Sequence, residues 1–268
     1  MNATDTVFAG SIPAIYDQYM VPLLFAPYAK LVAKRAAELR PRRILETAAG
    51  TGVVTEELLR ALPDAEIVAT DLNAPMLEQA SRRIEASKLR FQPADAQLLP
   101  FDNDSFDLVV CQFGVMFYPD KVRANAEARR VLREGGRYML VIWDRIELNL
   151  ATMTAARAVG EVFPGDAAKF YERVPFRYHD VGEIESDLLA AGFTDIEYET
   201  IELRSRAASA RDVAIGLVQG TPVRSEIEEI DPTKLSLATN AAAEALKQFE
   251  GPGGFDAPMS ARLVTAIK

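Results

Sequence analysis

The sequence predicts an α/β fold, in which helices join the strands of a mostly parallel sheet. From about residue 42 to 143, short apolar runs typical of strands alternate with amphipathic runs typical of helices. The apolar run at residues 44–45 leads into a loop of small residues. A helix with Val54, Leu58 and Leu62 on one face begins directly after that loop. Repeated units of strand, loop and helix are typical of parallel strands with crossover helices.

The loop after the first strand reads Glu-Thr-Ala-Ala-Gly-Thr-Gly over residues 46–52. Gly50 and Gly52 have no Cβ, so the backbone can approach a ligand closely, and the following helix points unpaired N–H groups at the loop. A carboxylate at Glu46 would repel a pyrophosphate, but it suits a ligand with a cationic amino group. This pattern therefore predicts a site for a charged cofactor that carries an amino group.

Two later strand-like runs also end in an acid. Asp71 closes the run at residues 67–71, and Asn73 is the expected cap of the next helix, with Pro75 in its first turn. Asp95 follows the run at residues 89–92. Chance would rarely place an acid at the end of three successive strands.

The residues around these acids resemble the class I S-adenosylmethionine-dependent methyltransferases. The family's first motif is an acid followed by alternating glycines, and this chain matches it with Ala48 in place of the first glycine. That replacement is tolerable if the backbone at Ala48 keeps a negative φ. Residues 46–55 also resemble, locally, the ubiquinone and menaquinone C-methyltransferases, over a stretch that defines no substrate. The further matching segments are residues 67–71, 94–96, 99–111 and 131–142.

This resemblance implies a Rossmann-like seven-stranded sheet flanked by helices, with helical cap insertions. Six strands would be parallel, and the last strand, at residues 261–267, would lie antiparallel beside the fifth. It also implies S-adenosyl-L-methionine as the cofactor. Asp71 would accept hydrogen bonds from both ribose hydroxyls, and Asp95 would sit against the adenine. The full set of implied cofactor residues is Tyr16, Tyr19, Glu46, Ala48, Gly50, Thr51, Gly52, Asp71, Leu72, Met76, Asp95, Ala96, Gln112 and Phe113.

Within that set, Gln112 and Phe113 follow the fourth strand and are expected nearest the sulfonium. Tyr16 and Tyr19 would contact the cofactor's carboxylate, although a packing face of a helix explains these tyrosines equally well. Cys111, inside the fourth strand, is interpreted as a small buried hydrophobe. Phe117, Tyr118 and Trp143 are consistent with either core or pocket wall.

Composition agrees with a cytoplasmic enzyme that acts on small molecules. The 268 residues are 49% hydrophobic, which is enough for a sizeable core. A net charge of −9 without a basic face argues against a nucleic-acid partner. The single cysteine excludes an internal disulfide, and no signal peptide or long apolar run indicates export or membrane insertion. We expect a monomer or homodimer that binds no metal, because no cluster of histidines or cysteines is present.

We expect the chain to combine a core with inserted caps. The core would comprise residues 41–145, with a helix and strand at 179–204 and the final strand at 259–268. The caps would be residues 1–40, 146–178 and 205–258, which would cover the methyl end of the cofactor and determine substrate choice. Helices are predicted within them at residues 16–39, 152–162, 211–218 and 238–249. In the core, Asp120 should cap a helix that Gly135 ends, and Asp180 should cap another with Glu183.

Methyl transfer is an in-line displacement, so the protein must align the acceptor and exclude water. An anionic O, N or C nucleophile needs no base. A protonated phenol or alcohol would need one, and His179 and Asp144 are the candidates. His179 is the only histidine in the chain, but it directly precedes the cap Asp180, which favours a structural role.

We therefore predict a methyltransferase that uses S-adenosylmethionine and acts on a small-molecule acceptor. Two other classes remain open. A dinucleotide-dependent oxidoreductase also uses a glycine loop, but Glu46 argues against it, and Thr55 stands where that fingerprint has its third glycine. A non-catalytic module of the same fold would bind the cofactor without an acceptor pocket.

Overall fold

A computed structural model describes residues 12–163 and 169–268 of the chain. The predicted caps at residues 1–40 and 146–178 therefore lie partly outside the described residues. The chain divides into two compact units. The core unit comprises residues 28–143, 178–201 and 261–268, and the helical unit comprises the described parts of residues 1–27, 144–177 and 202–260.

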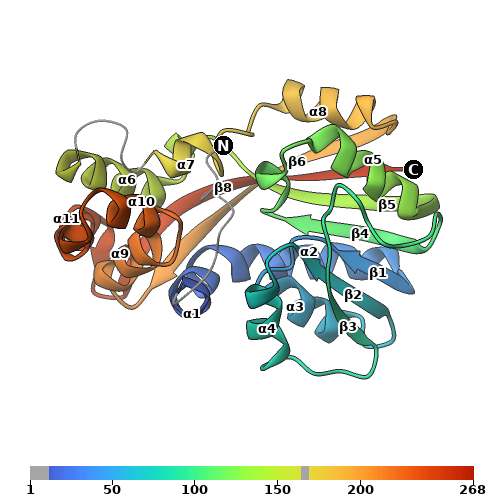
Figure 1. Cartoon of the computed structure of the whole chain (residues 1–268), viewed down its shortest axis with the longest axis horizontal. Helices are drawn as coiled ribbons and strands as arrows, with labels where there is room; N and C mark the ends of the chain where they lie inside the picture. The colour runs from blue at the N-terminus through green and yellow to red at the C-terminus, as the bar shows by residue number, and fades with distance from the viewer. Residues whose placement is uncertain (1–11, 164–168) are drawn as a thin grey trace. The chain divides into compact units, whose positions relative to one another are not determined.

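The core unit is built on a sheet with the strand order β3-β2-β1-β4-β5-β8-β6 (Figure 1). Strands β1 to β5 are parallel, and β8 pairs antiparallel with β5 from Arg137↔Ile267 to Trp143↔Ala261. The predicted α/β class and the antiparallel last strand are thus confirmed. The strands are β1 Arg43–Glu46, β2 Glu66–Asp71, β3 Leu89–Pro93, β4 Phe106–Gln112, β5 Leu132–Trp143, β6 Asp195–Ala207 and β8 Gly254–Ile267.

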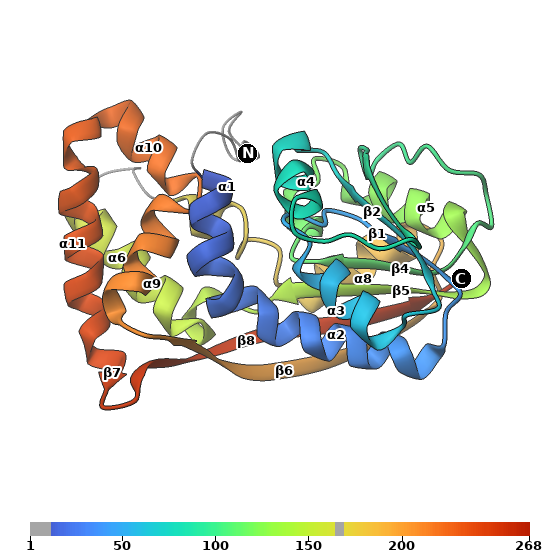
Figure 2. The same ribbon diagram turned by 90° about the horizontal axis from the view of Figure 1, so that it is seen from below.

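Helices cover both faces of this sheet. α2 (Ala26–Leu39), α3 (Val53–Ala61) and α4 (Ala74–Ser81) lie on one face, and α5 (Lys121–Val131) and α8 (Val181–Ala190) lie on the other (Figures 1 and 2). The central strands are therefore shielded from water on both sides and are apolar along most of their length. Ile44 and Leu45 of β1 and Val109 and Val110 of β4 are fully buried.

The helix caps agree with the sequence in part. Asp120 accepts a hydrogen bond from the N–H of Arg123, and Asp180 accepts one from Glu183 at 2.9 Å, as predicted. The prediction that Gly135 ends α5 is wrong. The helix stops at Val131 because Leu132 is already extended at φ −70° and ψ 143°, and Gly135 lies within β5.

Asn73 occupies the N-cap position of α4, but its side chain makes no capping hydrogen bond. Both its backbone N–H and its side-chain amide donate instead to Oδ1 of Asp71, at 2.8 and 3.4 Å. The predicted cap residue therefore supports the preceding acid rather than the helix. Pro75 lies in the first turn of α4, as expected.

The helical unit consists mainly of helices, of which α6, α9 and α11 pack side by side (Figure 2). The predicted helices at residues 152–162, 211–218 and 238–249 are confirmed, whereas α10 was not expected. The predicted helix at 16–39 begins with a π-helical stretch, an uncommon conformation. The helices of this unit are α1 Ile12–Ile15, η1 Tyr16–Phe25, η3 Ile146–Leu148, α6 Leu150–Val162, α7 Phe170–Arg173, α9 Ala210–Gln219, α10 Val223–Ile230, η4 Pro232–Lys234, α11 Leu235–Leu246 and η5 Lys247–Phe249.

A short strand, β7 (Glu250–Gly251), pairs antiparallel with the beginning of β8 in the helical unit. Across residues 12–163 and 169–268, no helix combines the length and apolar character that crossing a bilayer requires.

Candidate cofactor site

The candidate site is the loop at residues 47–52, which leaves the carboxyl end of β1 between β2 and β4. Three alternate residues of this loop are left-handed, with φ of +53° at Ala48, +57° at Gly50 and +83° at Gly52. The condition of a negative φ at Ala48 is therefore not met. Ala48 keeps the conformation of the glycine it replaces, at a cost of roughly 1 to 2 kcal/mol for a residue with a Cβ.

Hydrogen bonds on either side of Ala48 explain this strain. The N–H of Thr47 donates to the carbonyl of Val110 in β4, and the N–H of Ala49 donates to the carbonyl of Thr70 in β2, both at 2.9 Å. The loop is thus anchored to both neighbouring strands, one residue before and one residue after position 48. Ala48 must reverse the chain between these anchors, so it turns left-handed.

The second half of the loop opens α3. A Cβ at Gly52 would lie 2.7 Å from Cδ1 of Ile84, so both the positive φ and the close packing require glycine there. Arg83 donates to the carbonyl of Thr51 at 2.9 Å. The Thr51 hydroxyl is buried and has no hydrogen-bond partner among the described residues. A buried polar atom without a partner is costly, which is consistent with a ligand group at this loop.

Glu46 ends β1 and is only 2% exposed. The hydroxyl of Thr55, in the first turn of α3, donates to its Oε2 at 2.6 Å. Burial raises the pKa of Glu46 to about 8, the Thr55 hydrogen bond opposes this increase, and the negative charge of Asp71 adds to it. Near pH 7 the carboxyl of the ligand-free protein therefore holds a proton for much of the time, and a cation beside it would favour the charged form.

Asp71 ends β2 and connects that strand to the loop. The N–H of Gly50 donates to its Oδ2 at 2.9 Å, while Asn73 occupies Oδ1. Burial raises the pKa of Asp71, and the hydrogen bonds from Asn73 and Gly50 offset only part of that effect. Oδ2 can accept a further hydrogen bond, and a hydroxyl can replace the long bond of 3.4 Å from the Asn73 amide to Oδ1, so Asp71 can hold the loop and still accept hydroxyl groups from a ligand.

The predicted cofactor residues that follow β2 and β3 differ in exposure. Leu72 is 65% exposed, whereas Met76 is buried, with its Cε next to Gly50. Asp95 accepts a hydrogen bond from the N–H of Gln97 at 2.8 Å, so its carboxylate shapes a turn, and Ala96 beside it is half-buried. Single exposed leucines are common on protein surfaces, so contact of Leu72 with the cofactor stays a prediction.

Gln112, the last residue of β4, is half-buried, and Phe113, which begins the loop after β4, has a φ of +55° and is 7% exposed. The ring of Phe113 stacks on Trp143 with 3.8 Å between centroids, and Tyr28 packs edge-on against both rings. Trp143, which the sequence left undecided, is 4% exposed and belongs to the core. This cluster seats the loop firmly beside the carboxyl end of β4.

Three side chains that the sequence did not single out for the site link the two loops. The hydroxyl of Tyr118 donates to Oγ1 of Thr47 at 3.1 Å, and Sγ of Cys111 lies 3.3 Å from the same hydroxyl. Burial raises the pKa values of both Tyr118 and Cys111, so both groups are neutral near pH 7. Cys111 is fully buried, as expected, and it also takes part in this polar contact.

The two candidate bases, Asp144 and His179, lie in different units of the chain. Asp144, in the helical unit, is 3% exposed, and its oxygens accept hydrogen bonds from the N–H of Arg145 at 2.8 Å and the hydroxyl of Ser260 at 3.2 Å. His179, in the core unit, is half-buried and directly precedes the N-cap of α8. The structural role expected for His179 stays a prediction, and Asp144 stays a candidate base.

Tyr16 and Tyr19 also belong to the helical unit. Tyr16 stacks on Phe25 with 5.1 Å between ring centroids, and the Cβ of Tyr19 lies close to Gly216 of α9. Both tyrosines of η1 therefore pack against other residues of the helical unit. Their contact with the cofactor's carboxylate stays a prediction. The core unit brings together the remaining predicted residues of β1, β2 and the loop between β1 and α3.

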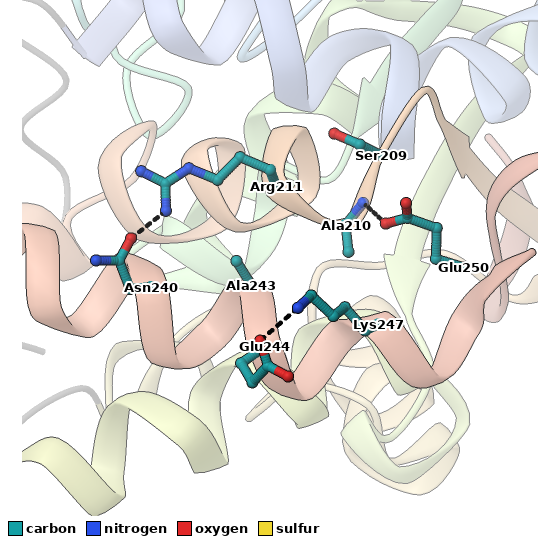
Figure 3. A pocket seen from close by; sticks show the side chains of 8 residues that line it. All are labelled: Ser209, Ala210, Arg211, Asn240, Ala243, Glu244, Lys247 and Glu250. Carbon is teal, nitrogen blue, oxygen red and sulfur yellow. Dashed lines mark hydrogen bonds and ion pairs between the residues drawn. The ribbon is translucent and has the colours of Figure 1, made fainter.

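The helical unit contains a separate hollow of about 390 Å³ between α9 and α11 (Figure 3). Its charged side chains are engaged with one another or with the backbone. Arg211 bonds to Asn240, Lys247 pairs with Glu244 at 2.6 Å, and Glu250 accepts from the N–H of Ala210. An ionic ligand would have to displace these partners, so the hollow does not compete with the glycine loop as the candidate site.

Comparison with known proteins identifies the family of this chain. Residues 44–136 match a family described as a methyltransferase domain. The chain is 31% identical over 183 residues to the ubiquinone/menaquinone biosynthesis C-methyltransferase UbiE of Dinoroseobacter shibae, covering 63% of this chain and 72% of that protein. The chain belongs to the class I S-adenosylmethionine-dependent methyltransferases.

Other relatives match over shorter stretches or in fold. The demethylmenaquinone methyltransferase of Deinococcus radiodurans is 40% identical over 114 residues, which span 42% of this chain and 47% of that protein. The phosphoethanolamine N-methyltransferase 2 of Haemonchus contortus, solved in complex with S-adenosyl-L-methionine, has a TM-score of 0.61 at 16% identity, with 100% of this chain and 60% of that chain covered. The Bacillus YcgJ protein gives 0.58 at 22% identity, covering 90% and 98%. These two structures support the fold.

Proposed function

We propose that this methyltransferase transfers the methyl group of S-adenosyl-L-methionine to a small-molecule acceptor. The observation that carries the proposal is the pair of buried acids, Glu46 and Asp71, on either side of the glycine loop. Neither forms an ion pair within the described part of the chain, and burial raises the pKa of both. Two desolvated acids without a cation are unfavourable unless a ligand provides the missing partners.

The residues present fit the parts of that cofactor. Glu46 would hold its cationic amino group, and Asp71 would accept hydrogen bonds from its ribose hydroxyls. The exposed Leu72 and the buried Met76 would flank the adenine, and the unsatisfied hydroxyl of Thr51 lies in the same loop. When bound, the cofactor supplies a methyl group activated by a sulfonium, and the chain's own task is to hold its position and exclude water.

For the acceptor, we propose an electron-rich aromatic ring as the first class to test. The two relatives matched in sequence are named as a ubiquinone/menaquinone biosynthesis C-methyltransferase and a demethylmenaquinone methyltransferase. An ionised hydroxyl on such a ring makes ring carbon or oxygen nucleophilic without a dedicated base. Such an acceptor would allow Asp144 and His179 to serve structural roles, through the hydrogen bonds of Asp144 and the place of His179 before the cap of α8. A neutral amine would need no base either, whereas an ammonium group would first have to lose a proton.

We infer a cytoplasmic setting from the single cysteine and the acidic composition. The same composition supports a small-molecule substrate rather than a nucleic acid, because phosphate recognition requires a basic face. The expected oligomeric state is a monomer or a homodimer.

Calorimetry with three ligands tests the cofactor. We expect S-adenosylmethionine and S-adenosylhomocysteine to bind and NAD to show no heat of binding. Binding of NAD alone would favour the dinucleotide-dependent alternative. Catalysis is tested separately, by following S-adenosylhomocysteine formation with a panel of phenols, hydroquinones and amines. Tight cofactor binding without turnover of any class would favour the non-catalytic module.

A further inference from the structure

Gly114 directly follows Phe113 in the loop after β4. The backbone conformation at this position does not require glycine. Its φ of −108° and ψ of −38° are open to any residue. What excludes a side chain is space. A Cβ at Gly114 would lie 2.4 Å from Cβ of Ala48 and 2.9 Å from Sγ of Cys111, closer than real Cβ contacts allow. Glycine at position 114 is thus a requirement set by a methyl group on the neighbouring loop.

Ala48 shows the opposite situation. Its φ of +53° favours glycine, yet the chain places a methyl group there. The methyl of Ala48 fills the space that a side chain at Gly114 would otherwise occupy. The two positions are complementary. Glycine stands at position 114, where there is no room for a Cβ, and alanine stands at position 48, where the positive φ favours glycine.

A hydrogen bond to Thr47, the residue directly before Ala48, also joins these two loops. The hydroxyl of Tyr118 donates to Oγ1 of Thr47 at 3.1 Å. Thr47 and Ala48 on one loop therefore contact Tyr118 and Gly114 on the other, at the two ends of the short helix η2 (Val115–Phe117). Strands β1 and β4 are direct neighbours, with Glu46 opposite Val110, so both loops leave the same edge of the sheet.

We propose that Ala48 and Gly114, together with the hydrogen bond between Tyr118 and Thr47, fix the spacing between the cofactor loop (residues 46–52) and the loop after β4 (residues 112–118). They act as positioning residues for the methionine end of S-adenosylmethionine, through packing and without touching the reacting atoms. This inference rests on the proposed function. It specifies how the chain holds the loop that presents Glu46 against the loop that carries Gln112 and Phe113.

The test compares Gly114→Ala, Ala48→Gly and the double variant, with calorimetry of S-adenosylmethionine, S-adenosylhomocysteine and adenosine. Adenosine lacks the methionine end, so it reports on the ribose and adenine positions alone. We expect Gly114→Ala to weaken both full-length ligands at least tenfold and adenosine less than twofold. Ala48→Gly should weaken them a few-fold, because the loop loses its packing partner while its strain is relieved.

The double variant moves the methyl group from one loop to the other. We expect it to recover at least half of the loss on a logarithmic scale, with Sγ of Cys111 limiting full recovery. Gly160→Ala is the matched control. It adds a methyl group to α6 where no atom lies within 4 Å, and it should leave all three affinities unchanged.

The inference fails if Gly114→Ala folds and keeps its affinity for S-adenosylhomocysteine within twofold, or if the double variant binds no better than Gly114→Ala. It also fails if adenosine is weakened as much as the full-length ligands. Should Gly114→Ala not fold, Tyr118→Phe replaces it, because it removes the hydroxyl link alone. Its expected loss is three- to fivefold for S-adenosylhomocysteine and none for adenosine, and an unchanged affinity for both would overturn the proposal.

A wild-type protein that binds neither full-length ligand would refute the proposed function independently of this pair. The packing would then be tested by thermal unfolding of the same variants. Non-additive melting temperatures of the two single changes would support the Ala48–Gly114 contact. Additive ones would refute it.

Discussion

Acids at the two ends of the parallel strands in the core unit have opposite surroundings. At the amino end, Oδ2 of Asp107 accepts hydrogen bonds from the N–H groups of Arg42 and Arg43 at 2.9 and 2.8 Å. Its other oxygen pairs with Arg133 at 2.8 Å. At the carboxyl end, Glu46 is bonded to a hydroxyl and Asp71 to neutral amide groups.

The pKa values follow this difference. Partial burial acts to raise the pKa of Asp107, but the N–H groups of Arg43 and Arg42 and the charge of Arg133 hold it below its ordinary value. Burial dominates at Glu46 and Asp71, and the pKa of each is raised. The amino end is therefore arranged for stability of the folded chain. The carboxyl end keeps unfavourable acids, which is typical of a functional site.

The largest expected effect concerns Glu46 and pH. A carboxyl whose pKa rises from 4.5 in the unfolded chain to about 8 in the folded one binds a proton more tightly when folded. The contribution of Glu46 to stability is then fully present below pH 4.5 and is lost as the pH rises to about 8, by roughly 3 to 5 kcal/mol. Glu46→Gln removes this loss, so the ligand-free variant should be more stable than wild type at pH 9 and weaker in binding S-adenosylmethionine.

Chemical denaturation of both proteins at pH 6 and pH 9 measures the difference. Glu66→Gln is the control, since Glu66 lies at the other end of β2 with its side chain 65% exposed. It should leave the pH dependence unchanged. Equal stability of wild type and Glu46→Gln at both pH values would show that Glu46 is not held protonated by burial.

Asp71→Ala should have the next largest effect. We expect cofactor binding to weaken by roughly 2 to 4 kcal/mol, because two hydrogen bonds to a charged acceptor are lost, and the anchor of Gly50 is lost with them. Asp71→Asn keeps one oxygen acceptor and should show a smaller loss. Calorimetry with S-adenosylhomocysteine decides the matter. An affinity within twofold of wild type would make Asp71 a turn residue only.

The acids of the site could be predicted from sequence because parallel strands bring their carboxyl ends to one edge of the sheet. Glu46 and Asp71 each end such a strand, so their shared location follows from their positions alone. Thr55 could also have been found. It stands at the position of the third glycine in a dinucleotide fingerprint, and a hydroxyl in the first turn of α3 reaches the acid at the end of β1.

Other features depend on contacts between distant segments. The left-handed Ala48 results from hydrogen bonds to β4 and β2, which the local sequence does not show. Gly114 is glycine because of a methyl group 66 positions earlier, not because of its own φ. The early end of α5 has a similar origin, since Leu132 pairs with Phe106 of β4 instead of continuing the helix towards Gly135.

Asp107→Asn tests the amino end of the comparison. The variant weakens the hydrogen bonds to Arg42 and Arg43 and removes the charge partner of Arg133, so we expect a loss of about 1 to 2 kcal/mol in stability. Because the pKa of Asp107 is lowered, its contribution is present above pH 3.8 and is lost as the pH falls. The difference between wild type and variant should therefore shrink between pH 7 and pH 3.

The affinity for S-adenosylhomocysteine should stay within twofold of wild type in this variant. A large loss of affinity would contradict the division between a stabilising amino end and a binding carboxyl end. It would mean that Asp107 transmits its effect along β4 to the loop at residues 112–118.

The smallest effect is expected at His179, the chain's only histidine and the residue that most invites assignment as a base. It directly precedes Asp180, whose carboxylate caps α8 through the N–H of Glu183. Once an acceptor is identified, we expect His179→Ala to lower kcat by less than about tenfold, whereas loss of a general base typically costs 10² to 10⁴. A thousandfold loss with unchanged affinity for S-adenosylhomocysteine would contradict this. It would also indicate an acceptor that arrives protonated, most simply a hydroxyl, and would place a working group on the α8 side of the core unit.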